Sequence, residues 1–458
     1  MTDPVLAPVF AFLKEHHVTS KPLLLAFSGG PDSLALLHAL IAYKKKVSAF
    51  TFAIAHVNHG WRKESQKEAD EIQVLANDLG LSFHLIELNP STMSGNLEAL
   101  CRMARYQFFE GLCDEFGYHA VLLGHHADDL AETVLKRVFE GSSLSKLSAM
   151  APYSYMGRSL LWRPLLCVRK QVLLDWLASR GLKGYSDCTN DDERFMRARF
   201  RKTLMPSLAK TFGKELIDPL CQVAAESLEL REYLQTIALP YLKMLKHSIF
   251  GSFLDFTEMM PNTMFEMKAL LKSLSYEGEV ILSRDILQKM AHHLMVGSAN
   301  KEFICQGLRL FVDRKRLFIR SKFIPRLGSI MTIEPVEGIY LFGNLKIEVS
   351  VSDENQNYQW HRPIGWKGLW EEGVQVYLPF GHYTLAPPEK MEQARLTHLI
   401  NWWSRNKVPN FLRRSLPVVL QNGRIVHEFL SGAFYQSQSD TVTKQPYLAL
   451  NIRLPFLG

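Results

Sequence analysis

The chain has 458 residues, a length that predicts two or three domains rather than one. Apolar residues make up 47% and charged residues 22%, as in ordinary soluble globular proteins, and the net charge of +7 is too small to identify a nucleic-acid partner by itself. The six cysteines form no C-x-x-C pair, and no apolar run approaches the roughly 18 residues of a membrane helix. We therefore expect a cytoplasmic protein with reduced thiols, without a zinc site, an iron–sulfur cluster or a membrane anchor.

Short apolar runs alternate with helix-length amphipathic segments between residues 21 and 200. Strands are predicted at Lys21–Phe27, Val47–His56, Ser82–Leu88 and His119–Gly124. Helices are predicted at Leu34–Tyr43, Lys63–Leu79, Leu97–Phe116, Asp129–Glu140 and Arg169–Arg180. This alternation predicts a Rossmann-like α/β domain, a parallel sheet with helices on both faces. Ligands of such sheets bind beyond the carboxyl ends of the strands.

The character of the sequence changes after about residue 210. Residues 211–290 have mostly helical apolar spacing, and two strand-like stretches follow at 303–312 and 316–321. After a plausible linker at Pro325–Gly328, the chain alternates in the β manner and contains one further predicted helix, Leu396–Lys407. We therefore predict a catalytic α/β domain over 1–210, a mainly helical middle domain over 211–323 and an α+β domain over 324–458.

The most informative motif is Ser28–Ser33 (SGGPDS), which follows the first predicted strand and opens the first predicted helix. A strand, a glycine turn and a helix direct backbone N–H groups and a helix N-terminus at one anion. The glycines let the main chain approach phosphate oxygens, and Asp32 can hold a metal ion against the same phosphates. The pattern resembles the PP-loop signature of enzymes that cleave ATP between the α- and β-phosphates.

A second motif, His125–Thr133 (HHADDLAET), follows the predicted strand at 119–124. On a helix that begins near residue 128, Asp129 and Glu132 share one face. These carboxylates can hold Mg²⁺ or a substrate ammonium group, and the sequence leaves both assignments open. Acidic residues also suit a helix start for electrostatic reasons alone, but the position at a strand end favours a functional site.

Two weaker motifs lie near the same predicted edge. His56 and His59 (HVNHG) close the second strand, and because no further Cys or His is near, contacts to adenine or ribose suit them better than zinc. Arg102, Arg105 and Tyr106 share a face of the predicted helix 97–116, where one of the arginines can neutralise phosphate charge.

Basic residues gather in two places. The first cluster ends the predicted catalytic domain and consists of Arg194, Arg197, Arg199, Arg201 and Lys202. The second runs from Arg395 to Arg424 without any Asp or Glu, includes Arg413 and Arg414, and is interleaved with aromatic residues, Trp402, Trp403 and Phe411. A run of like charges is usually just solvated, but basic residues with aromatics at two separate places favour a long polyanion such as folded RNA.

Together these motifs closely resemble those of the tRNA(Ile)-lysidine synthetase family of the PP-loop ATP pyrophosphatase superfamily. The resemblance is dense over about 1–210 and recognisable over 395–426. It rests on SGGxDS, HxxHG, an RxxRY element, HHxxDxxET and the Arg-Pro-Leu-Leu at Arg163–Leu166. One departure is Ala198, which stands where the family usually has Asn between two arginines.

The resemblance implies a ligase that forms a C–N bond. With ATP and Mg²⁺, such an enzyme adenylates the wobble cytidine of the CAU-anticodon isoleucine tRNA, and free L-lysine then displaces AMP to give lysidine. The alternatives are another PP-loop tRNA-modifying enzyme, such as a thiolase, and a small-molecule PP-loop synthetase. A thiolase normally needs cysteine pairs, and a small-molecule synthetase would lack the basic C-terminal cluster. The oligomeric state stays open.

The resemblance also implies roles for individual residues. Catalytic roles are expected for Asp32, Arg105, His125, Asp129 and Glu132. ATP is expected to contact Ser28, Gly29, Gly30, Pro31, Asp32, Ser33, His56 and His59. Mg²⁺ is expected at Asp32 and Asp129, and tRNA at Arg194, Arg197, Arg199, Arg201, Arg413 and Arg414.

Overall fold

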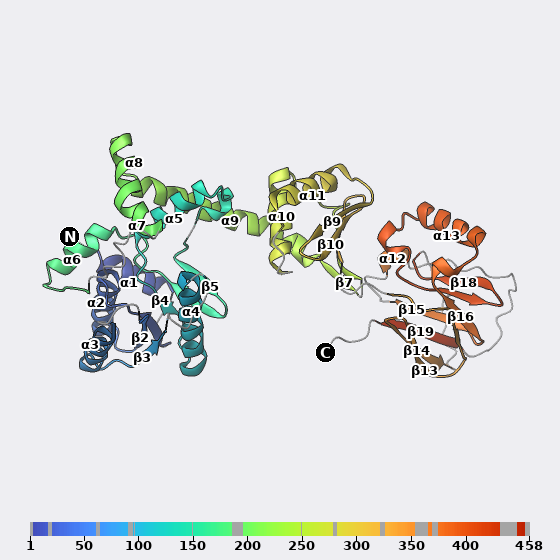
Figure 1. Ribbon diagram of the computed structural model, residues 1–458, viewed down its shortest axis with the longest axis horizontal. Helices are drawn as coiled ribbons and strands as arrows, with labels where there is room; N and C mark the ends of the chain where they lie inside the picture. The colour runs from blue at the N-terminus through green and yellow to red at the C-terminus, as the bar shows by residue number, and fades with distance from the viewer. Residues whose placement is uncertain are drawn as a thin grey trace. The chain divides into compact units, whose positions relative to one another are not determined.

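The computed structural model forms two compact units, Met1–Glu232 and Tyr233–Gly458 (Figure 1). The residues that it describes are 3–16, 21–60, 65–89, 95, 97–148, 150–185, 196–248, 250–277, 282–320, 326–352, 365–368, 374–430 and 447–453. Within these ranges, no helix is long and apolar enough to cross a membrane. The predicted division into three domains stays a prediction.

The first unit is built on a six-stranded sheet in the order β3-β2-β1-β4-β6-β5. Its strands are β1 (Leu23–Ala26), β2 (Phe52–Asn58), β3 (Phe83–Glu87), β4 (Val121–Leu122), β5 (Tyr153–Met156) and β6 (Ser159–Trp162). Neighbouring strands are parallel except β5 and β6, which form an antiparallel hairpin. The predicted parallel α/β fold is confirmed, and the β5–β6 hairpin is an addition that the sequence did not predict.

Helices cover both faces of this sheet (Figure 1). They are α1 (Leu6–Glu15), α2 (Pro31–Lys46), α3 (Ser65–Asp78), α4 (Leu97–Phe116) and α6 (Lys170–Ala178), whereas α5 (Ala127–Phe139) packs its apolar side chains with Leu166 and Ala224. Because side chains alternate along a strand, Leu23 and Leu25 of β1 pack with α1, α2, α3 and α6, whereas Leu24 packs against α4 on the other face. A central strand that is buried on both faces requires the continuous apolar run that the sequence has there.

The chain continues through three helical segments. They are α7 (Met196–Arg199), a π-helical turn over Phe200–Leu204 and α8 (Met205–Phe212). The long helix α9 (Ile217–Lys243) follows.

The second unit starts at Tyr233, within α9, and contains α10 (Met264–Glu277), α11 (Arg284–Val296) and a five-stranded antiparallel sheet in the order β7-β8-β11-β10-β9. These strands are β7 (Lys246–Ser248), β8 (Gly251–Asp255), β9 (Lys301–Cys305), β10 (Leu308–Val312) and β11 (Arg316–Arg320). The stretch predicted as one strand over 303–312 is a hairpin, because Gln306 and Gly307 adopt positive φ angles and turn the chain. This part therefore contains more strand than its mainly helical sequence pattern indicated.

Two four-stranded sheets complete the second unit, in the orders β12-β16-β17-β18 and β13-β14-β19-β15. The strands are β12 (Met331–Ile333), β13 (Gly338–Phe342), β14 (Leu345–Ser352), β15 (Val374–Pro379), β16 (Tyr383–Ala386), β17 (Val418–Gln421), β18 (Arg424–Glu428) and β19 (Tyr447–Arg453). The helices are α12 (Gly365–Gly368) and α13 (Gln393–Arg405). The α+β architecture is as predicted; Pro325 of the predicted linker lies outside the described residues.

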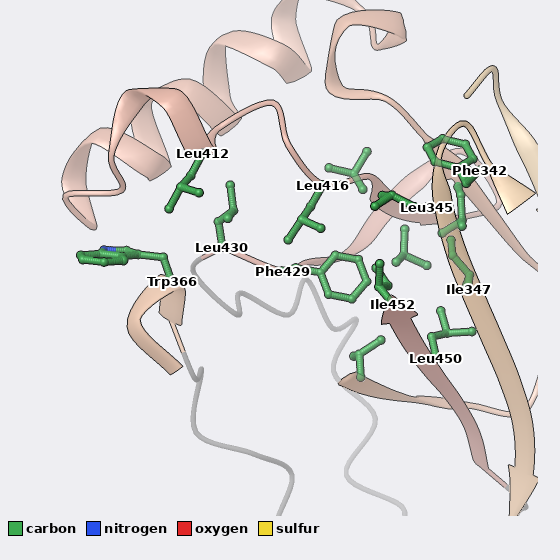
Figure 2. Close-up of a cluster of buried hydrophobic side chains, with 14 of the residues drawn as sticks. Phe342, Leu345, Ile347, Trp366, Leu412, Leu416, Phe429, Leu430, Leu450 and Ile452 are labelled. Carbon is green, nitrogen blue, oxygen red and sulfur yellow. The ribbon is translucent and has the colours of Figure 1, made fainter. Parts of the chain in front are cut away.

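The core of this last part is apolar and shared by both sheets. Figure 2 shows Ile347 of β14 close to Leu450 and Ile452 of the neighbouring strand β19, and Phe342 of β13 close to Leu345. Burial of such side chains is the main stabilising contribution to a domain of this size.

Candidate active site

The loop between β1 and α2 is closed by its own serines. The Ser33 hydroxyl donates to Gly30 O at 3.0 Å and lies 3.2 Å from the Ser28 hydroxyl, which accepts from Gly30 N at 3.4 Å. Gly29 has a φ of +79°, Gly30 is the N-cap of α2, and Pro31 occupies its first turn. Ser33 is buried, so its hydroxyl stabilises the loop at the start of α2, and a helix N-terminus favours an anion.

Two neighbouring segments fix this loop through close backbone contacts. A Cβ atom at Gly124, two residues after the end of β4, would lie 3.1 Å from Asp32 C and from Ser33 N. A Cβ atom at Gly184, after α6, would lie 2.8 Å from Pro31 N. The next residue, Tyr185, donates its N–H to Gly29 O at 2.9 Å and its hydroxyl to a carboxylate of α3 at 2.6 Å. Both glycines are therefore required by the loop, which sequence reasoning did not predict.

His126, the N-cap of α5, lies among three carboxylates. Its Nε2 atom is 3.7 Å from Asp32 Oδ1 and 3.5 Å from Asp129 Oδ2, and its Nδ1 atom is 3.7 Å from Asp128 Oδ2. Burial lowers the pKa of His126 more than these carboxylates raise it. The sequence had favoured His125 for a catalytic role; the structure brings His126 to Asp32 and Asp129, while His125 helps to lower the pKa of Asp129.

The predicted carboxylate pair of α5 holds a cation. The Arg201 guanidinium donates hydrogen bonds to Glu132 Oε1 and Asp129 Oδ1. Burial opposes ionisation of Asp129, but its electrostatic interactions with His126 and Arg201 outweigh burial and lower the pKa of Asp129. Burial alone would lower the pKa of Arg201. Its hydrogen bond and ion pair with Glu132 have the larger effect, so the pKa of Arg201 is raised above its ordinary value. Arg201 was expected on a tRNA-binding surface and instead lies on these carboxylates.

Two basic residues at the start of α6 complete the site, and the sequence analysis assigned neither of them. Lys170 Nζ lies 2.6 Å from Asp32 Oδ1, and the Lys170 N–H donates to Asp128 Oδ2 at 2.7 Å. Arg169 lies 3.8 Å from the same Asp128 carboxylate and 3.1 Å from Asp218 of α9. Their position, at a predicted helix start shortly after the Arg-Pro-Leu-Leu motif, was the available signal.

The remaining predicted residues of the first unit lie in different surroundings. His56 is buried, with Nδ1 2.9 Å from Phe27 O, and burial lowers its pKa; this contact joins β2 to the chain after β1. His59 lies half-buried just beyond the end of β2. On α4, Arg105 packs its guanidinium carbon 5.4 Å from the centre of the Tyr106 ring, beside Arg102 at 5.1 Å.

The two basic clusters differ from their predicted form. In the first, Arg199 is exposed and Ala198 is buried, whereas Arg194 and the Arg197 side chain lie outside the described residues. In the second, Arg414 is exposed and lies 3.7 Å from Glu389, but Arg413 donates to Val408 O at 3.1 Å and to Ser404 Oγ at 3.2 Å.

The aromatic residues of the second cluster belong to the core. Trp403 is buried and donates its Nε1–H to Glu428 at 2.8 Å. Phe411 stacks on Phe311 with ring centres 4.3 Å apart, and Trp402 is partly buried against the same core. The interpretation of these aromatics as part of an RNA-binding surface is therefore wrong, because the apolar face of α13 and the turn that follows it pack inward.

Comparison with known proteins identifies the family. A sequence model of the PP-loop domain matches residues 5–208, which contain the closed loop, His126 and the carboxylates. The tRNA(Ile)-lysidine synthase of Protochlamydia amoebophila (strain UWE25) is 35% identical over 430 residues, 93% of each chain. This chain belongs to the tRNA(Ile)-lysidine synthase family.

Two further members of the tRNA(Ile)-lysidine synthase family are shorter matches. The synthase of Chlamydia muridarum (strain MoPn / Nigg) is 39% identical over 279 residues, which cover 60% of this chain and 85% of the relative. The synthase of Chlamydia pneumoniae is 38% identical over 291 residues, 63% of this chain and 88% of the relative. As a member of the tRNA(Ile)-lysidine synthase family, this chain is a PP-loop ligase that uses ATP and modifies tRNA, as the motifs predicted.

Proposed function

We propose that this chain ligates free L-lysine to the wobble cytidine of the CAU-anticodon isoleucine tRNA, giving lysidine, AMP and pyrophosphate. The observation that carries this proposal is the buried carboxylate pair Asp129 and Glu132, which holds the side-chain cation of Arg201 beside the PP-loop. A pair that can hold one guanidinium can hold the ammonium group of an amino-acid substrate in exchange. A sulfur-transfer reaction does not require such a pair of carboxylates.

The first step places ATP on the loop. The glycine turn at Gly29 and Gly30, together with the N-terminus of α2, suits the phosphates of ATP. The carbonyl oxygen of cytidine attacks the α-phosphorus, the bond to the bridging oxygen breaks, and the electron pair leaves with pyrophosphate. The amine of lysine, in its neutral form, then attacks the adenylated carbon; AMP leaves with the former carbonyl oxygen and the electron pair of the broken C–O bond, and the new C–N nitrogen gives its extra proton to water. Fixed donors and cations at the phosphates stabilise the developing charge.

Mg²⁺ is proposed at Asp32 and Asp129. Both carboxylates face the His126 Nε2 atom, at 3.7 and 3.5 Å, and the described residues contain no group of three or more His, Cys, Asp or Glu that could hold a metal. Two carboxylates without a larger cage suit Mg²⁺, which takes its other ligands from phosphates and water. When bound, the ion would supply positive charge to the phosphates, in place of the Lys170 and Arg201 charges that neutralise these carboxylates here.

For tRNA, we propose contacts from exposed arginines of both units, Arg199 and Arg414. Arg199 lies on α7, two residues before Arg201, so a tRNA bound there is close to the carboxylate site. Arg194, Arg197 and Arg413 remain proposed contacts as well, although the bonds of Arg413 to Val408 and Ser404 also give it a structural role. Phosphate contacts of this kind position a nucleic acid without reading its sequence.

ATP–pyrophosphate exchange, measured with and without tRNA, tests the proposal. We expect exchange that depends on isoleucine tRNA with a CAU anticodon, and transfer of labelled lysine to that tRNA but not to methionine tRNA. A small-molecule synthetase would exchange without tRNA. Transfer of sulfur instead of lysine would indicate a thiolase and overturn the proposal.

A further inference from the structure

Lys170 connects the phosphate-binding loop to a third helix. Its Nζ atom lies 2.6 Å from Asp32 Oδ1, although 138 residues separate the two in the chain. About a third of each side chain is exposed, so both can be reached from solvent. Lys170 is also the first residue of α6, and its own N–H is bound to Asp128 at 2.7 Å.

These contacts bring three helix N-termini together. Asp32 lies in the first turn of α2, His126 caps α5, Asp128 lies in the first turn of α5, and Lys170 opens α6. Each N-terminus carries partial positive charge, and three of them at one place suit a ligand with several negative charges. In the structure, aspartates cover these N-termini, and Lys170 neutralises the aspartate nearest to the loop.

A triphosphate on the loop changes the surroundings of that ion pair. The Asp32 carboxylate would repel the phosphates unless a cation lay between them, and a lysine is suited to follow such a change because its ammonium is a point charge on a flexible stem. The Arg169 side chain is less free to move, because it is paired with Asp218 and Glu215 of the region around α9.

We propose that Lys170 binds the β- and γ-phosphates of ATP and then the departing pyrophosphate, after exchanging its Asp32 contact for phosphate oxygens. The inference rests on the proposed adenylation, in which the bond between the α-phosphorus and the bridging oxygen breaks and its electron pair goes to pyrophosphate. Lys170 gives up no proton in this step; its charge balances the charge that develops on the leaving group. A purely structural role, in which Lys170 only holds Asp32 against α6, is the competing explanation.

Direct binding of inorganic pyrophosphate separates the two explanations. Isothermal titration calorimetry on the full chain is carried out with wild type, Lys170→Met and the control Lys136→Met, which removes an exposed lysine of α5 paired with Glu140. We expect Lys170→Met to weaken pyrophosphate binding by about 10- to 100-fold, as for loss of a charged hydrogen bond, with tRNA affinity unchanged. Lys136→Met should bind like wild type. A Lys170→Met affinity within about twofold of wild type would overturn the inference.

A second variant pair keeps the test clear of folding effects. Without Mg²⁺, Asp32→Asn should bind pyrophosphate more tightly than wild type, because a repelling charge is removed and Lys170 is released. In the Asp32→Asn background, Lys170→Met should weaken pyrophosphate binding at least as much as it does in the wild-type background; a Lys170→Met change without effect there would contradict a phosphate contact by Lys170. Wild-type AMP formation from ATP, tRNA and lysine is measured alongside, and its absence would count against the proposed function rather than against Lys170.

Discussion

The charged residues of the two units differ in how firmly the fold holds them. In the first unit, Arg201 lies between Asp129 and Glu132, and His126 faces three carboxylates at 3.5 to 3.7 Å. In the second unit, the side chain of Arg414 is 64% exposed and lies 3.7 Å from a single carboxylate. Salt weakens the exposed pair far more than the buried ones. The first arrangement suits chemistry that requires fixed positions, and the second suits attraction of a polyanion from solution.

The largest expected effect is on catalysis by the first unit. We expect Asp32→Ala to lower AMP formation from ATP, tRNA and lysine by about 1,000-fold, because both the metal ligand and the partner of Lys170 are lost. The fold should persist, since the Asp32 side chain is partly exposed. Asp70→Ala on α3 is the control and should react at the wild-type rate. Near-normal AMP formation by Asp32→Ala would remove this loop from the metal and phosphate site.

Glu132→Gln tests the carboxylate pair. The change removes one charge from the buried site that holds Arg201, so we expect the KM for lysine to rise by about 10- to 100-fold. The KM for ATP should change by less than about threefold. Glu140→Gln, at the exposed end of the same helix, is the control. An unchanged lysine KM and turnover would place the ammonium elsewhere.

In the second unit, the buried residue His427 makes the free energy of unfolding depend on pH. Burial lowers the pKa of His427, on β18, to about 3. Below its ordinary value of about 6.5, the unfolded chain therefore binds a proton that the folded chain does not, and stability falls as the pH falls from 6.5 toward 3. Urea unfolding at pH 7 and pH 5 should show a loss of about 2 kcal/mol from this group. His427→Leu should remove that part of the loss, and an equal pH dependence in both proteins would contradict it.

The smallest expected effect concerns the exposed arginine. Arg414→Ala should weaken tRNA binding a few-fold and reduce the slope of log affinity against log salt by about one, while ATP binding stays unchanged. Arg413→Ala is the informative comparison, because its guanidinium bonds Val408 O and Ser404 Oγ and its loss should also cost about 1 kcal/mol of stability. Filter binding over a range of salt measures both. An unaltered slope for Arg414→Ala would mean that this side chain is only solvated surface.

The sequence predicted the features of the site that depend on neighbouring residues. The loop over 28–33 and the helix that carries Asp129 and Glu132 follow from local patterns, and the parallel sheet places them at one edge. Local patterns could not predict which residues far apart in the chain contact each other. Lys170 meets Asp32 across 138 positions and Arg201 meets Glu132 across 69, so each looked like an ordinary surface cation in the sequence.

The second unit was predicted less completely for a related reason. Strands β7 and β8 have three and five residues and lie between helices, so neither shows a period long enough to recognise. The aromatic residues around Arg413 were assigned to an RNA-binding surface. An amphipathic helix whose aromatic face packs inward has the same alternation of aromatic and basic residues, so the sequence alone does not distinguish the two. Contacts such as Phe411 on Phe311 decide between the two.

The contact between Gly29 and Tyr185 has a consequence for the order in which the two positions can evolve. A Cβ atom on residue 29 would lie 2.4 Å from the Tyr185 ring, and the φ of +79° disfavours any residue with a Cβ there by about 1 to 2 kcal/mol. Shrinking the ring of Tyr185 relieves the first obstacle but not the second. Position 185 can therefore vary while glycine stays at 29. A residue with a Cβ at position 29 keeps the cost of the positive φ whichever residue stands at 185.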